Sequence, residues 1–272
     1  MKASSPNLPV PSWLVGKWKR SYIRRAVKSQ AANTKDNDDG DIALLGEPDK
    51  TVEVTYLQTP WAFVDIRRPP VVIETSTETA MAFAGVTTVD QGDDDRTEHH
   101  NNNNDGNNTT SPPLVNWHAC LEMDSKDMDN KKRWSEAYEG NPRPTEDKGY
   151  FQNVSENLGI AHAFLEHDPD NTLEELWIRE NDGHGKFFAA TRNDCALLVI
   201  CGDSFGYANQ DTNVYVSGRI SKESTETGGV ELLVEMSAGD RKLEGTVLNL
   251  EKDEWKILPG STLSESFIFG DL

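Results

Sequence analysis

Positive charge is scarce in this sequence. Its 272 residues include 27 lysines and arginines against 46 aspartates and glutamates, which gives a formal net charge of -19 at pH 7. A protein that binds the phosphates of nucleic acid needs a basic patch to neutralise them. The charge balance therefore argues against a nucleic-acid partner, and equally against docking on an anionic membrane. One basic cluster occurs near the N-terminus, and we interpret it as a solvated face and loop. It consists of Lys17, Lys19, Arg20, Arg24, Arg25 and Lys28.

Cysteines and long apolar runs are also few. Cys120, Cys195 and Cys201 are the only cysteines, and their spacing fits neither a metal site nor an even-numbered set of disulfides. No run approaches the roughly 20 apolar residues of a membrane span, and the N-terminus lacks the apolar core of a secretion signal. The sequence therefore predicts a cytoplasmic protein with no metal site and no membrane insertion. It indicates neither a cofactor nor an oligomeric state.

Amphipathic helices of three turns are missing from the pattern as well. Short runs with a period of two take their place, as where Val52, Val54 and Tyr56 alternate with Glu53 and Thr55. About eight to ten such runs, separated by turns at near-regular spacing, predict an all-β fold, a sandwich or a barrel. The continuous apolar run at 196–201 predicts the most buried strand, because a strand covered on both faces loses its alternation.

The stretch from 61 to 67 has two usable faces. Ala62, Val64 and Ile66 make one of them aliphatic. A strand that also carries aromatic and ionic groups on its other face suits a barrel with a polar and aromatic interior. That second face consists of Trp61, Phe63, Asp65 and Arg67.

The same logic recurs at 173–180, with sequence LEELWIRE. Turn residues bracket this run, so we expect a strand rather than a helix. Leu176 and Ile178 share one face. The opposite face combines charge with an aromatic ring, and it consists of Glu175, Trp177 and Arg179.

Polar, low-complexity stretches divide the chain. Residues 1–11 are rich in proline and serine and predict a flexible arm. The stretches near 28–50 and 88–113 are too polar to offset the entropy of ordering them, so we expect disordered insertions. The remainder, 12–272, is expected to form a single domain.

Several short motifs, in this order and spacing, resemble the lipocalin-like (calycin) superfamily, and within it an uncharacterised family. The match spans roughly two-thirds of the chain and excludes the two insertions. The resemblance implies a single antiparallel barrel of about eight to ten strands, with a Gly-X-Trp start whose tryptophan closes one end, and it implies no established activity. The motifs are Gly16-Lys-Trp18-Lys-Arg20, Tyr56-Leu-Gln58, Phe63-X-Asp65-X-Arg67-X-Pro69, Phe83-Ala-Gly85, Trp117-His118 with Leu121-Glu122, Asp147-Lys-Gly149, Glu175-X-Trp177-X-Arg179 and Gly202-Asp203-X-Phe205-X-Tyr207-Ala208.

Charged and aromatic residues of these strands are the candidates for a ligand site in one cavity. An arginine can hold a carboxylate by two parallel hydrogen bonds, and a desolvated histidine near a carboxylate can act as a general base. The alternative is that these side chains lie outside the barrel or form buried pairs that only fix strand register. The ligand-binding candidates are Trp61, Phe63, Asp65, Arg67, Trp117, His118, Glu175, Trp177 and Arg179, and the catalytic candidates are His118 and Glu122.

Three classes of function fit these residues. The first is a binder of a small, mostly apolar ligand, which can carry a carboxylate, in the barrel interior. The second is a cofactor-free enzyme of isomerase or cyclase type that uses the same cavity for acid/base chemistry. The third is a protein-interaction scaffold. A nucleophilic hydrolase is disfavoured, because the sequence has no nucleophile elbow and no alternation of strands with helices.

Overall fold

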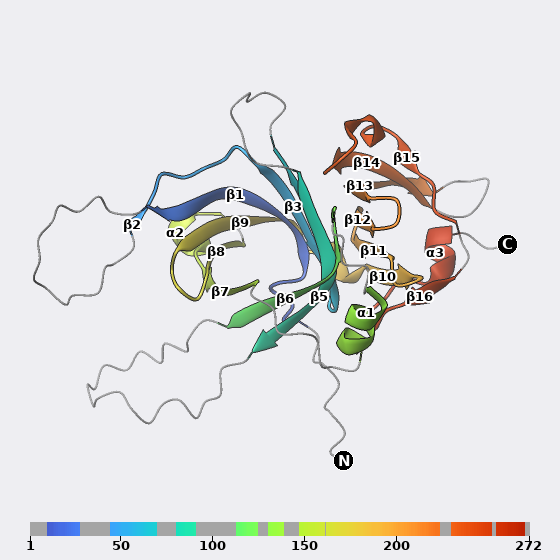
Figure 1. The fold of residues 1–272 in the computed structure, drawn as a ribbon, viewed down its shortest axis with the longest axis horizontal. Coiled ribbons are helices and arrows are strands. Elements are labelled where there is room, and N and C mark those ends of the chain that lie inside the picture. The colour runs from blue at the N-terminus through green and yellow to red at the C-terminus, as the bar shows by residue number, and fades with distance from the viewer. Residues whose placement is uncertain are drawn as a thin grey trace, which may run out of the picture.

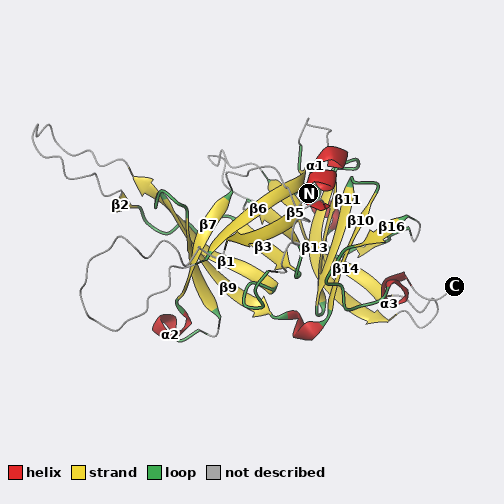
Figure 2. Cartoon of the chain, turned by 90° about the horizontal axis from the view of Figure 1, so that it is seen from below, coloured by secondary structure: helices red, strands yellow, loops and turns green. Residues whose placement is uncertain are grey.

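The protein is all-β, as the sequence predicts, and its strands form two sheets that lie side by side (Figures 1 and 2). The computed structural model describes residues 10–27, 44–69, 80–90, 113–124, 130–138, 147–160, 162–223, 230–251 and 254–269.

The first sheet closes into an antiparallel barrel of eight strands. Each strand pairs with its neighbour along the chain, and the last pairs back onto the first. A short strand, β2 (Leu44–Leu45), extends one edge of the first strand. The architecture is compatible with a lipocalin-like barrel. Its strands are β1 (Gly16–Val27), β3 (Glu53–Gln58), β4 (Ala62–Arg68), β5 (Met81–Asp90), β6 (Leu114–Glu122), β7 (Lys148–Asn153), β8 (Ala163–His167) and β9 (Leu173–Asn181).

The second sheet contains seven strands in the order β15-β14-β13-β12-β11-β10-β16. Period-two patterning indicates which residues share a strand face but not which sheet the strand joins, so the sequence did not separate this sheet from the barrel. Its strands are β10 (Phe187–Arg192), β11 (Ala196–Cys201), β12 (Ser204–Asn209), β13 (Val214–Glu223), β14 (Val230–Ser237), β15 (Val247–Leu248) and β16 (Trp255–Ile257).

The helices are short. The longest in the described ranges is α1 (Asn130–Tyr138), and α2 (Ser155–Leu158) and α3 (Glu265–Phe269) are single turns. Two 3-10 turns, η2 (Gly183–Gly185) and η3 (Arg241–Leu243), complete the elements. The apolar run at 263–269 contains α3. Among the helices described, none has the length and apolar character that a membrane crossing requires.

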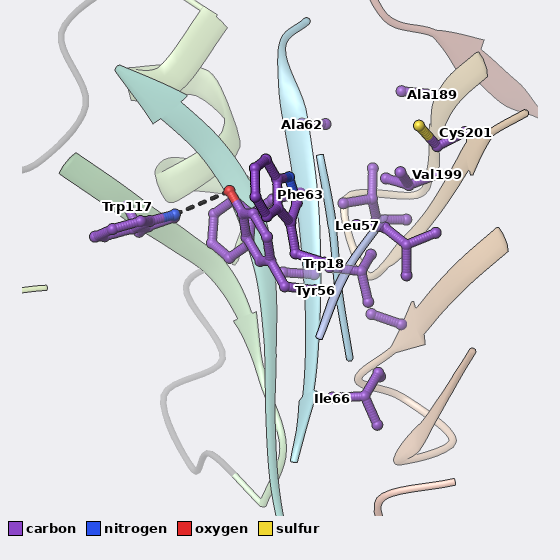
Figure 3. Packing of buried hydrophobic residues seen from close by; sticks show 14 of the residues in the cluster. Trp18, Tyr56, Leu57, Ala62, Phe63, Ile66, Trp117, Ala189, Val199 and Cys201 are labelled. Atoms are coloured by element: carbon purple, nitrogen blue, oxygen red, sulfur yellow. Dashed lines mark hydrogen bonds between the residues drawn. The ribbon is translucent and has the colours of Figure 1, made fainter. Parts of the chain in front are cut away.

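The second sheet packs on the outer wall of the barrel. Leu57 of β3 points out of the barrel towards Val199 of β11 (Figure 3). Val64 of β4 and Leu197 of β11 belong to the same apolar cluster, and all four side chains are fully buried. Gly206 of β12 lies so close that a Cβ there would come within 2.9 Å of the Val64 Cβ. The aliphatic face predicted for the 61–67 stretch is therefore the contact between the two sheets.

Strand β11 is buried on both faces. Leu197 and Val199 face the barrel, while Leu198 and Ile200 face a second core that includes Trp255. Every residue of the strand is buried, which confirms the prediction from its continuous apolar run.

The predicted arm and insertions coincide largely with stretches outside the described residues, namely 1–9, 28–43 and 91–112. Their described margins are structured. Val10 is buried and donates a backbone hydrogen bond to Pro60, Asp49 forms a bridge to Ile23, and β5 continues to Asp90. The assignment of 12–272 to a single domain stays a prediction.

Candidate functional site

Strand β4 turns its polar face into the barrel. Phe63 is fully buried and contacts the rings of Tyr56 and Phe83, with centroid distances of 5.9 Å in both cases. Asp65 pairs in register with Tyr56, and both residues line the interior together with Arg67. Figure 3 shows Tyr56 and Phe63 on one side of this wall and Leu57 on the other.

Trp18 of β1 is buried and lines the barrel interior. Its side chain is 1% exposed, and its indole N–H donates to the Leu14 carbonyl at 2.8 Å. The Arg179 guanidinium lies 5.6 Å from the centroid of the indole ring, a cation–π contact. Phe164 packs against the ring edge at 5.3 Å. Trp18 is thus a core residue, and its role in closing a barrel end stays a prediction.

A chain of neutral hydrogen bonds runs across the interior. The Trp117 indole N–H donates to the Tyr56 hydroxyl at 3.0 Å, and Tyr56 donates to Oε1 of Gln58. Thr87 donates to the same amide oxygen at 2.7 Å. Burial raises the pKa of Tyr56 above its ordinary value, because the phenolate would lose its hydration. The tyrosine therefore stays a neutral donor and acceptor.

Two buried ion pairs occupy the interior. Arg67 makes a bidentate contact to Asp65, with Nε at 3.1 Å from Oδ1 and Nη2 at 3.0 Å from Oδ2. Arg20 donates to Glu175 at 2.6 Å, and both of these side chains are almost fully buried. Burial acts to lower the pKa of Arg67, but the carboxylates of Asp65 and Glu175 outweigh it and raise that pKa. Arg20, expected on a solvated face, is inside the barrel because Glu175 compensates its charge.

Glu166 of β8 is a buried carboxyl of this interior that forms no ion pair with any described residue. Glu166 is 8% exposed, and its Oε2 accepts a hydrogen bond from the Trp177 indole N–H at 2.7 Å. Within the part of the chain that the structure describes, no lysine, arginine or histidine nitrogen lies within 4.0 Å of it. Burial first, and then the charges of Glu175 and Asp147, raise its pKa well above the usual range.

The neighbouring strand makes room for this carboxyl. Gly149 of β7 lies beneath it, and a Cβ at that position would come within 2.7 Å of both the Glu166 Cγ and its Oε1. Any side chain at position 149 would push the carboxyl aside. The glycine of the Asp147-Lys-Gly149 motif therefore serves to position Glu166.

These groups surround a narrow cavity. Its volume is about 20 Å³, which is room for about one water molecule. Asp147 stands at the rim, where its side chain is exposed and the cavity reaches solvent. Partial loss of hydration raises the pKa of Asp147 to about 6, although Arg67 opposes the shift. The cavity is lined by Leu14, Trp18, Tyr56, Asp65, Arg67, Phe83, Trp117, Asp147, Phe151, Glu166 and Trp177.

The structure brings part of the candidate set together. Asp65, Arg67, Trp117 and Trp177 line the cavity. Two further candidates are buried nearby. Phe63 contacts the ring of Tyr56, and Glu175 accepts a hydrogen bond from Arg20.

The remaining candidates lie elsewhere. His118 contacts the Thr88 hydroxyl through Nε2 at 2.8 Å, and Glu122 pairs with Arg133 of α1 at 3.1 Å. Trp61 packs over Gly260 in a groove at the junction of the two sheets. Arg179 covers Trp18 from outside the cavity.

Sequence reasoning missed the most unusual residue, Glu166. The sequence did contain a signal for it. Phe164 and Glu166 are two residues apart and share one face of β8, just as Glu175 and Trp177 share one face of β9. The sequence does not indicate which face of β8 points into the barrel. That follows from the pairing of Phe164 with Trp177 across the two strands. The other lining residues outside the candidate set are Leu14, Trp18, Tyr56, Phe83, Asp147 and Phe151.

The site can hold a small group by hydrogen bonds and aromatic contacts, and it can exchange a proton through its carboxyls. Over the described ranges, no group of three or more histidine, cysteine, aspartate or glutamate side chains could hold a metal ion. No family model matches this chain, and neither a curated protein nor a solved structure was found to match it.

Proposed function

We propose that this protein binds a small, mostly apolar ligand in the interior of its barrel. The observation that carries the proposal is Glu166, a buried carboxyl without an ion-pair partner in the described chain, at the wall of a cavity that reaches solvent. Buried polar groups in folded proteins almost always have at least one hydrogen-bond partner, and Glu166 has one in Trp177, whereas an ionised carboxylate offers about four acceptor positions. A group left with spare bonding capacity in a cavity suits a ligand that completes it.

The apolar contribution comes from aromatic rings. Trp117, Phe83, Phe151 and Trp177 line the cavity beside the polar groups, which matches the usual make-up of ligand sites, with few polar groups among many apolar ones. The free space admits a group of about the size of water. A larger ligand needs some of these rings to turn aside, and such a movement is measurable.

The tryptophans make the proposal testable by fluorescence. We expect at least one of three matched probes, 2-phenylethylamine, 2-phenylethanol and phenylacetate, to change the tryptophan emission saturably. Phe83→Trp, which fills the cavity, should lower that affinity about tenfold or more. Phe267→Trp, on the far side of the second sheet, is the matched control and should leave it unchanged. The absence of saturable binding by all three probes would overturn the proposal.

Acid/base catalysis in the same cavity is a second candidate. The observation that favours it is a pair of carboxyls with raised pKa values, Glu166 and Asp147, since a general acid or base works best with a pKa near the working pH. In this version the catalytic groups are those two, because His118 and Glu122 lie away from the cavity. Turnover of a bound compound that Glu166→Gln abolishes, with binding intact, would distinguish the enzyme from the binder. A cytoplasmic location and a scaffold role both stay predictions from the sequence alone.

A further inference from the structure

We propose further that the ligand carries a positive charge, most simply a primary ammonium group, and that Glu166 is its counter-ion. This inference rests on the proposed function, binding in the barrel interior. It names the chemical class of the ligand, and it differs from the carboxylate that the sequence allows.

The charges of the interior arginines are already compensated by carboxylates of the protein. Arg67 gives its Nε and Nη2 donors to both oxygens of Asp65. Arg20 is held by Glu175 at 2.6 Å, with both side chains almost fully buried. A carboxylate ligand would therefore gain no uncompensated cation from these two arginines, and it would add a negative charge near Glu175 and Asp147.

Glu166, by contrast, can accept more. One of its oxygens takes a single hydrogen bond from Trp177, whereas an ionised carboxylate offers about four acceptor positions. Its nearest charged neighbours are mostly of its own sign, since Glu175 and Asp147 act on it more strongly than Arg67 does. A cation placed beside Glu166 relieves this repulsion, and an anion increases it.

The aromatic walls favour the same sign of charge. The face of an aromatic ring attracts cations through its quadrupole, most strongly in tryptophan, and Trp18, Trp117 and Trp177 all line the cavity. Arg179 already uses one face of Trp18 in this way. The rings therefore supply both apolar contact and attraction for a cation.

The size of the free space selects the kind of cation. Before any ring moves, it admits only an end group of about the size of water, which an –NH₃⁺ group matches and a trimethylammonium group exceeds. An ammonium group also brings three donors, which fit the spare acceptor positions of Glu166.

The test compares the affinities of the three probes by calorimetry. They share a phenyl ring and differ in the end group, which is ammonium in 2-phenylethylamine, hydroxyl in 2-phenylethanol and carboxylate in phenylacetate. We expect the amine to bind about tenfold or more tightly than the alcohol, as a charge-assisted hydrogen bond is worth more than a neutral one. We expect phenylacetate to bind most weakly. Because Glu166 holds its proton unusually firmly, amine binding near neutral pH should also release protons, seen as an enthalpy that depends on the buffer.

Glu166→Gln removes the charge but keeps an acceptor for Trp177, so we expect it to abolish both the preference for the amine and the proton release. Glu174→Gln is the matched control. Glu174 is equally buried on the adjoining strand, but it bonds Tyr22 and Arg24 and does not line the cavity. Binding of the alcohol or of phenylacetate as tight as that of the amine, or an amine affinity unchanged in Glu166→Gln, would overturn this inference and leave the proposed function standing. Failure of all three probes would overturn both.

Discussion

The two faces of strands β3 and β4 differ in what they contribute. On the outer face, Leu57 and Val64 meet the second sheet and are fully buried in an apolar cluster that includes residues of that sheet. On the inner face, Tyr56, Asp65 and Arg67 are held by hydrogen bonds and an ion pair. The same two strands thus form a dry contact on one side and a polar site on the other.

This difference shows where stability and chemistry lie. Burying a side chain such as Leu57 contributes about 1.5–3 kcal/mol and requires no exact partner. A buried ion pair such as Asp65–Arg67 contributes little net free energy, because desolvation offsets the attraction, yet removing one partner is costly. We infer that the contact between the sheets supplies stability, while the interior supplies groups in fixed positions.

The largest expected effect concerns Arg67. Arg67→Leu leaves the Asp65 carboxylate, 4% exposed, without its partner, so we expect a loss of about 3–5 kcal/mol in the free energy of unfolding. The double variant with Asp65→Asn should recover part of that loss. Arg68→Leu is the matched control, because the carboxylates that it leaves, Glu53 and Glu244, are 42% and 26% exposed and can be hydrated, so it should cost about 0–1 kcal/mol. Urea melts measure all four proteins, and equal small losses for Arg67 and Arg68 would show that the inner face is solvated.

A smaller effect is expected on the outer face. Gly206→Ala places a Cβ about 2.9 Å from the Val64 Cβ, so overpacking should cost about 1–3 kcal/mol. Adding Val64→Ala returns the space, and the cost of the double variant should therefore fall below the sum of the two single costs. Strict additivity in urea melts would contradict direct packing of Gly206 on Val64.

The smallest effect is a dependence on pH that belongs to the inner face alone. Burial raises the pKa of Glu166 in the fold above its ordinary value of 4.5, so the native state binds a proton more firmly than the unfolded state. The contribution of Glu166 to stability is therefore full below about pH 4.5 and is lost as the pH rises towards its raised pKa.

Glu166→Gln removes this dependence. Relative to the wild type, the variant should gain stability progressively as the pH rises from about 4.5 to 7, in melts at several pH values. Parallel stability curves for wild type and Glu166→Gln would mean that the carboxyl is hydrated in the fold.

Much of the fold was predictable because strand patterning is local. The alternation at 61–67 identified the two faces of β4, and the apolar run at 196–201 identified a strand covered on both sides. The charge balance was the basis for arguing against a nucleic-acid partner, and the cysteine spacing for arguing against a metal site. The candidate site was predictable only in part, since Asp65, Arg67, Trp117 and Trp177 reach the cavity while His118 and Glu122 do not.

Sequence by itself determined the fold class of this protein and the side chains that share each strand face, because a period of two is a property of the extended backbone. Only the tertiary structure decided which face points into the barrel and which strands leave it for a second sheet. It also decided that Glu166 has no ion-pair partner among the described residues while Arg20 and Arg67 do. The physical reason is that pairing and burial depend on register between strands distant in the chain, as with Arg20 and Glu175, and such register is not encoded in any local pattern.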